Sequence, residues 1–162
     1  MAPENYANWA WRNAAEAAGE AVVFDIDGVL ADASARQHFL RGVRPDWDGF
    51  FAGVHEDPLI DEVARLVDVI DHSLRVVLMT GRPLSVQAKT MAWLERHGIR
   101  WDVLIMRNFG DYSAARQFKE IELDKMARHG LNARLAFEDD ERNVAMFKAH
   151  GVPCVYIHSG YY

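Results

Sequence analysis

The chain has 162 residues, of which 50% are apolar, and this length and composition suffice for one domain with a buried core. Its formal net charge of −6 argues against broad nonspecific binding to nucleic acid, which usually requires a basic face, but is compatible with a few arginines around one phosphate. No apolar stretch is long enough to span a bilayer, and no secretory signal is visible. We therefore expect a cytoplasmic protein without membrane contact. The single cysteine, Cys154, excludes an internal disulfide and is interpreted as a buried apolar residue.

The N-terminal segment, residues 3–19, is rich in Ala, Trp and Asn, and two alternatives fit it. It forms either a short helix that ends at Gly19 and is docked by Trp9 and Trp11, or a flexible tail. We therefore separate residues 1–20 from a domain at 21–162.

An apolar run at 21–24 leads into Asp25-Ile26-Asp27-Gly28, a pattern typical of the central strand of a parallel sheet. Ligands bind at the carboxyl ends of such strands, so we expect Asp25 and Asp27 at the rim of the sheet. Gly28 lets the chain turn, so that one carboxylate faces the pocket and the other its entrance. This pair suits one carboxylate that attacks or holds a metal and one that transfers a proton. Alone the pattern is weak, because turns and calcium loops share it.

Residues 31–57 form an irregular insert that is too short to build a cap domain with its own core. Trp47, Phe50 and Phe51 lie close together in this insert. We interpret them as a small local core under the loop, with stacking on nucleobases as the alternative.

The rest of the chain alternates between helices and strands, which predicts an α/β fold: a Rossmann-like parallel sheet with helices on both faces. Asp57 is the expected N-cap of the first helix, and Pro58 its first residue. Helices are expected at 57–70, 83–97, 112–129 and 140–150, and strands at 75–79, 102–106, 134–138 and 153–157.

More polar residues follow the later strands or lie early in the following helices. They are Thr80, Gly81 and Arg82 after the second strand, Lys119 in a later helical segment, and Glu138, Asp139 and Asp140 after a further strand. Because parallel strands end at one edge of a sheet, these side chains can converge with Asp25 and Asp27.

This order of motifs, over about residues 21–162, resembles the haloacid dehalogenase-like phosphohydrolase superfamily. That superfamily has Asp-x-Asp after its first strand, Thr or Ser after its second, then a Lys, then an acidic pair. The chain is similar in particular to the 3′-phosphatase domain of phage-type polynucleotide kinase/phosphatases. This closer resemblance rests on Arg36, Thr80-Gly81-Arg82, Arg107 with Gly110 and Asp111, the stretch 118–122, and Ser159-Gly160. The chain departs from the family at Val29, where Thr is usual, and at Asp140, where an arginine is usual.

The resemblance implies a Mg²⁺-dependent phosphomonoesterase with an open site and a minimal cap. Asp25 would form an aspartyl-phosphate, Asp27 would act as general acid and base, and Thr80 and Lys119 would bind phosphoryl oxygens. Mg²⁺ would be held by Asp25, the backbone carbonyl of Asp27 and Asp139, with Glu138 in support. Arg36, Gly81, Arg82 and Arg107 would contact the substrate.

Several of these residues have a structural alternative. Thr80 also fits a turn-capping hydroxyl, Lys119 a solvated helix lysine with Lys125 as its substitute, and Asp140 a helix N-cap. Each of the three arginines also fits an ordinary surface position.

The substrate predicted by the resemblance is a polynucleotide 3′-phosphate or a nucleotide. A small-metabolite phosphatase is the second hypothesis, and a non-catalytic domain like a signalling receiver the third. A receiver has its acidic pair after the first strand and its lysine last, an order opposite to this one. No P-loop for a kinase activity is present. The sequence leaves open the physiological substrate, the oligomeric state and any partner kinase.

Overall fold

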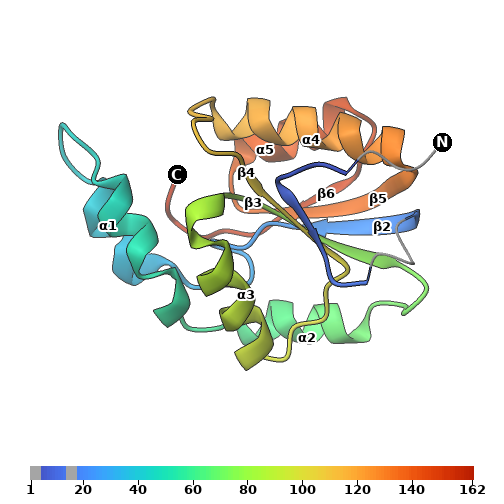
Figure 1. The fold of residues 1–162 in the computed structure, drawn as a ribbon, viewed down its shortest axis with the longest axis horizontal. Helices are drawn as coiled ribbons and strands as arrows, with labels where there is room; N and C mark the ends of the chain where they lie inside the picture. The colour runs from blue at the N-terminus through green and yellow to red at the C-terminus, as the bar shows by residue number, and fades with distance from the viewer. Residues whose placement is uncertain (1–4, 14–17) are drawn as a thin grey trace.

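The computed structural model describes residues 5–13 and 18–162 and confirms the α/β class (Figure 1). Six strands form one sheet in the order β1-β4-β3-β2-β5-β6, in which only the β1–β4 pair is antiparallel. The strands are β1 (Trp9–Trp11), β2 (Gly19–Phe24), β3 (Arg75–Pro83), β4 (Val103–Arg107), β5 (Leu131–Glu138) and β6 (Cys154–Tyr156). Among the described residues, no helix has the length and hydropathy needed to cross a membrane.

The helices lie on both faces of the sheet, as predicted (Figure 1). Helices α2 (Asp61–Val69) and α3 (Gln87–Arg96) cover one face, and α4 (Ala115–His129) and α5 (Glu141–Ala149) cover the other. The insert contains α1 (Trp47–Ala52) and two 3₁₀-helices, Ser34–Leu40 and Val54–Glu56; a third 3₁₀-helix, Leu84–Val86, precedes α3.

Strand β2 lies between β3 and β5 and has apolar contacts on both sides. Val22 and Phe24 belong to the core beneath α2 and α3, whereas Ala21 and Val23 belong to the core beneath α4 and α5. Because both faces are buried, the strand is a continuous apolar run rather than an alternating one. This burial fixes the position at which the chain emerges at the edge of the sheet, immediately before Asp25.

The N-terminal segment differs from the expected helix, because Trp9–Trp11 forms the edge strand β1. The Trp-Ala-Trp alternation directs both indoles to one face, where each ring contacts His129. The Trp9 indole N–H also donates to Glu122 Oε2 at 2.6 Å. The tryptophans therefore dock the segment on α4, as expected. The other parts of this prediction, at 1–4 and 14–17, lie outside the described residues.

The expected N-cap at Asp57 is wrong, because the N-cap of α2 is Ile60, three residues later. The intervening residues run extended: the N–H of Ile60 donates to Leu30 O, and Leu59 pairs with Ala31. Asp57 is instead buried, with its carboxylate turned into the protein.

The local-core interpretation of the insert holds for two of its three aromatics. Phe50 is buried, and Phe51 packs against the main core, whereas Trp47 is 53% exposed. Cys154 is buried in the core beneath α4 and α5, as expected, and burial raises the pKa of its thiol to about 12.

Candidate active site

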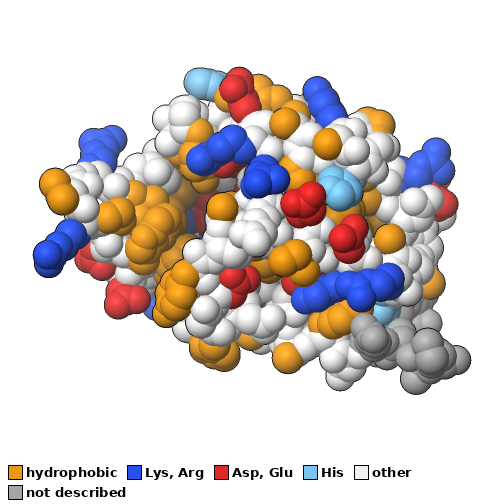
Figure 2. All heavy atoms as spheres, turned by 90° about the horizontal axis from the view of Figure 1, so that it is seen from above, with side chains coloured by type: hydrophobic (Ala, Val, Ile, Leu, Met, Phe, Trp, Pro, Cys, Tyr) orange, Lys and Arg blue, Asp and Glu red, His pale blue; other side chains and the backbone are white. Residues whose placement is uncertain are grey.

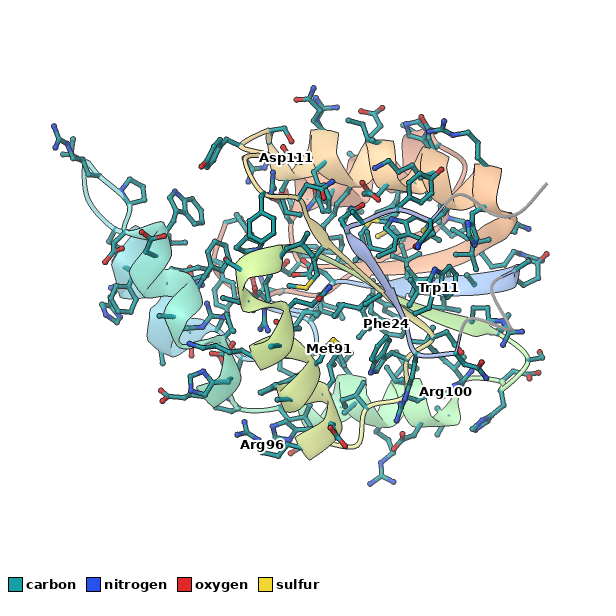
Figure 3. The ribbon with its side chains drawn as sticks, viewed as in Figure 1. Trp11, Phe24, Met91, Arg96, Arg100 and Asp111 are labelled. Carbon is teal, nitrogen blue, oxygen red and sulfur yellow. The ribbon has the colours of Figure 1, made fainter. Side chains whose placement is uncertain are left out.

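The site begins at the turn that follows β2, next to Phe24 in the middle of the sheet (Figure 3). The Ile26 carbonyl accepts hydrogen bonds from the N–H groups of three residues, 29, 30 and 31, so the chain folds back at once. Gly28 has φ +82°, and a Cβ there would lie 2.1 Å from Asp139 Oδ2. Only glycine fits this backbone conformation and the close approach of the Asp139 carboxylate. The turn sends the side chains of Asp25 and Asp27 to different partners.

Asp25 lies beside a buried lysine. The Lys119 ammonium, from the second turn of α4, is 3.1 Å from Asp25 Oδ2 and donates to Glu138 Oε1 at 2.5 Å. Asn143 also donates to Glu138 Oε1, at 3.0 Å. Burial alone would lower the pKa of Lys119, but the two carboxylates outweigh it and raise that pKa. The lysine is therefore a fixed positive charge inside the site.

Lys125, the substitute candidate, lies elsewhere. Its ammonium donates to Glu122 Oε1 at 2.7 Å and stands 5.0 Å from the centre of the Tyr6 ring. The structure thus brings Lys119, and not Lys125, to Asp25.

Three carboxylates converge at the ends of β2 and β5. Asp25, Glu138 and Asp139 each offer one oxygen, and these oxygens lie within 4.8 Å of one another. Burial and the Asp25 charge raise the pKa of Asp139 to about 7, and burial and Glu138 raise the pKa of Asp25 well above its usual range. Both Asp139 oxygens are buried and have no hydrogen-bond partner within residues 5–13 and 18–162. Carboxylate oxygens that repel one another, of which the two on Asp139 have no hydrogen-bond donor among the described residues, fit a divalent cation such as Mg²⁺.

Asp27 has a different environment, formed by two arginines. Its Oδ1 accepts from Arg36 Nη2 at 2.8 Å and from Arg82 Nη2 at 2.7 Å. Although burial pushes the pKa of Asp27 upward, the two guanidinium groups outweigh it and lower that pKa.

The same two arginines also bind Asp57, which sequence reasoning missed as a site residue. Arg36 makes a two-pronged contact with Asp57, Nε to Oδ1 at 2.8 Å and Nη2 to Oδ2 at 2.6 Å, and Arg82 Nη2 approaches Oδ2 at 3.4 Å. Arg82 is 0% exposed. The remaining Nη1 groups donate to Phe50 O and to Thr90 Oγ1. The four charged side chains, Asp27, Asp57, Arg36 and Arg82, thus form a quartet, in which Asp27 is half-buried and the other three are buried. Arg36 and Arg82 are not ordinary surface arginines, and their substrate role stays a prediction.

The last residues of β3 form the next part of the rim, because this strand extends to Pro83 and does not end at 79 as predicted. Thr80 is buried, and its hydroxyl accepts the N–H of Arg82 at 3.2 Å, so the turn-capping contact is present. Arg107 donates through Nε to Gly81 O at 3.3 Å and through Nη1 to Ser113 O at 2.6 Å. Arg107 is therefore held beside Gly81 by contacts separate from those of the quartet.

Asp140 is the N-cap of α5, as interpreted from the sequence. Its carboxylate accepts the N–H of Arg142 at 2.9 Å and pairs with that residue's guanidinium at 2.8 Å.

We predict that Asp57→Asn destabilises the protein by about 3 to 5 kcal/mol, because it leaves two buried guanidinium groups with one carboxylate between them. Urea unfolding measures this change in the free energy of unfolding. Asp68→Asn, an exposed position on α2, is the matched control and should leave that free energy nearly unchanged. Equal stabilities of the two variants would show that the quartet does not depend on Asp57.

Residues 19–162 match the family model described as the polynucleotide kinase PNKP phosphatase domain. No curated protein matches the chain.

Among solved structures, two of the Pnkp1/Rnl/Hen1 complex are similar. One has 22% identity and a TM-score of 0.71, covering 87% of this chain and 46% of the other. The second, described as an RNA repair complex, has 20% identity and a TM-score of 0.72, covering 96% of this chain and 47% of the other. The chain thus spans about half the length of these relatives.

A haloacid dehalogenase superfamily hydrolase from Geobacter sulfurreducens has 18% identity and a TM-score of 0.58, with coverage of 86% and 89%. At such identities the likeness to solved structures shows the fold alone. The family-model match extends over β2 to the last residue and includes every predicted site residue. The chain therefore belongs to the family of PNKP phosphatase domains, within the haloacid dehalogenase-like superfamily of phosphohydrolases.

Proposed function

We propose that this phosphatase is a Mg²⁺-dependent phosphomonoesterase that removes the terminal 3′-phosphate from a polynucleotide through an aspartyl-phosphate on Asp25. The observation that carries the proposal is the position of Lys119, whose ammonium lies 3.1 Å from Asp25 in a cluster of three carboxylates. An attacking carboxylate next to a buried cation and a metal-binding set of oxygens is the combination that phosphoryl transfer requires.

Asp25, Asp139 and the backbone carbonyl of Asp27 would hold Mg²⁺, with Glu138 in support through its contact with Lys119. The bound ion supplies positive charge, which reduces the repulsion between a carboxylate and a phosphate dianion. The orphaned oxygens of Asp139 support this assignment.

In the first step, an Asp25 oxygen attacks phosphorus, and the bond from phosphorus to the 3′-oxygen breaks. Asp27 must be protonated to give a proton to that leaving oxygen; its two arginines lower its pKa, and the negative phosphate of the substrate would raise it. In the second step, Asp27 takes a proton from a water molecule, which attacks the acyl phosphate and releases inorganic phosphate. The two arginines on Asp27 hold its carboxyl group in one orientation for both transfers.

Lys119 and Thr80 would bind the equatorial phosphoryl oxygens, where negative charge is stabilised in the transition state. The raised pKa of Lys119 supports this role, because the ammonium stays charged throughout the neutral range. Arg107, at the rim beside Gly81, would contact the substrate further from the phosphorus.

The polynucleotide substrate is supported by the family of the chain and by the origin of two similar structures in the Pnkp1/Rnl/Hen1 complex. A small-metabolite phosphatase is the competing function, because the same chemistry acts on any phosphate monoester.

The two lysines give a first test. Lys119→Ala should lower kcat/KM by at least about a hundredfold, because a charge that stabilises the transition state in a buried site has no replacement. Lys125→Ala should leave kcat/KM nearly unchanged, and thermal unfolding of both variants identifies any loss of fold. Full activity in a folded Lys119→Ala protein would contradict the assignment.

A second test detects Mg²⁺ binding through thermal stability, without an activity assay. Saturating Mg²⁺ should raise the Tm of the wild type, because an ion that binds only the folded state stabilises it. Asp139→Asn should abolish most of this shift, whereas Asp68→Asn should retain it. A shift of the same size in all three proteins would place the ion outside the carboxylate cluster.

The substrate is tested by comparing kcat/KM for a 3′-phosphorylated oligonucleotide, a nucleoside 3′-monophosphate, a nucleoside 5′-monophosphate and a sugar phosphate. We expect the oligonucleotide to be the best substrate. If it is the worst by a large factor, the polynucleotide proposal is wrong and the small-metabolite function takes its place.

A further inference from the structure

Among the large aromatic side chains that face solvent near the carboxyl end of the sheet, three lie on the insert and on the loop after β4. Trp47 is 53% exposed, Phe109 is 75% exposed and Tyr112 is 95% exposed. They belong to α1 of the insert and to the loop between β4 and α4, which lie at the same end of the sheet (Figure 1). Neither the core nor the proposed chemistry accounts for them, and grouped exposed apolar side chains mark binding sites.

Trp47 is tied to the site through Phe50. The Trp47 ring stacks on Phe51, with ring centres 5.8 Å apart, and meets the edge of Phe50 at 5.9 Å. The Phe50 ring in turn lies 4.3 Å from the Arg36 guanidinium, which binds Asp27. The Phe50 ring therefore contacts both the exposed Trp47 indole and Arg36 of the charged quartet.

The other two aromatics are tied to the opposite side of the site. Arg107, at the start of their loop, donates a hydrogen bond to Gly81 O. It also donates to Ser113 O, near the end of the same loop. The loop thus departs from the rim immediately beside the Thr80 turn. Figure 3 shows Asp111 on this loop, and Figure 2 shows apolar side chains gathered on the insert, at the left of the view, beside a hollow in the surface.

We propose that Trp47, with Phe109 and Tyr112, stacks on the unpaired bases that adjoin the terminal phosphate, so that the protein selects a single-stranded 3′ end. This inference rests on the proposed function. A phosphate held at Asp25 is joined to its own chain, which would leave the site at the end of the sheet where the insert and the β4–α4 loop lie. Every base has a π face, so aromatic rings bind it without sequence preference. Bases in a duplex are already stacked and paired, so the rings favour a single strand.

Two basic side chains on the insert are also suited to binding a single-stranded nucleic acid. Arg41 and Arg44 are exposed in the segment before α1 and form no ion pair within the part of the chain that the structure describes. The protein has a formal net charge of −6, and these two arginines give this segment the positive charge that phosphodiester groups require. Few charges combined with aromatic rings suit a short single-stranded contact rather than a long basic groove.

The test compares 3′-phosphorylated single-stranded oligonucleotides with intact bases and with abasic sugars at the last two positions. For the wild type, the abasic change should raise KM about tenfold to a hundredfold and leave kcat nearly unchanged, because stacking binds substrate and transition state alike. Trp47→Ala and Tyr112→Ala should each raise KM for the intact substrate. Each should therefore reduce the difference in KM between the intact and the abasic substrate. Trp47→Phe should restore much of that difference. Ile121→Ala removes an apolar side chain that is 47% exposed on α4, and should behave as the wild type.

Equal KM values for intact and abasic substrates in the wild type would overturn the stacking proposal while leaving the 3′-phosphatase intact. Hydrolysis of small phosphate esters without hydrolysis of any oligonucleotide would overturn the proposed function instead. Alanine variants that keep the wild-type KM for every substrate would also overturn the stacking proposal, and would assign the aromatics to a partner protein.

Discussion

The structure of the site depends on one buried ion-pair cluster, in which the Lys119 ammonium lies between Asp25 and Glu138. Strands β2 and β5 are neighbours, so their acidic ends necessarily meet. Buried carboxylates at such separations repel one another and would take up protons without a compensating charge. Helix α4 supplies that charge from the face of the sheet opposite α2 and α3. Asp139, whose two carboxylate oxygens have no hydrogen-bond partner among the described residues, is where the proposed cation would bind.

The turn at Gly28 separates the two aspartates of the motif into different electrostatic environments. Asp25 has one lysine and two acidic neighbours, and its pKa is raised; Asp27 has two arginines, and its pKa is lowered. These shifts alone favour a protonated Asp25 and an ionised Asp27, so the proposed mechanism requires a bound cation to ionise Asp25 and the negative substrate phosphate to raise the pKa of Asp27. The insert contributes to this separation, because Arg36 comes from its first 3₁₀-helix and Asp57 from its end. The insert thus supplies one arginine and one carboxylate to the site.

The sequence predicted those features that local patterns determine. The apolar run of β2 and the acidic turn after it predicted a central strand and the position of Asp25, and the order of the motifs predicted the family. Asp57 was missed because an acidic residue before Pro58 has the same pattern whether it caps a helix or binds arginines distant in the sequence. Strand β1 was missed because three residues carry little local signal, and its stability comes from pairing with β4. The exposure of Trp47 likewise depends on tertiary packing, because Phe50 and not Trp47 occupies the buried position in α1.

The central claim is that Asp25 carries the phosphoryl group during turnover. The most direct measurement is acid quenching of the enzyme during a single turnover of a 3′-phosphorylated oligonucleotide with Mg²⁺, followed by peptide mass spectrometry. We predict an acyl phosphate on the peptide that contains Asp25, which hydroxylamine removes. Phosphate on another residue, or substrate consumed with no phosphorylated enzyme at any quench time, would contradict the account.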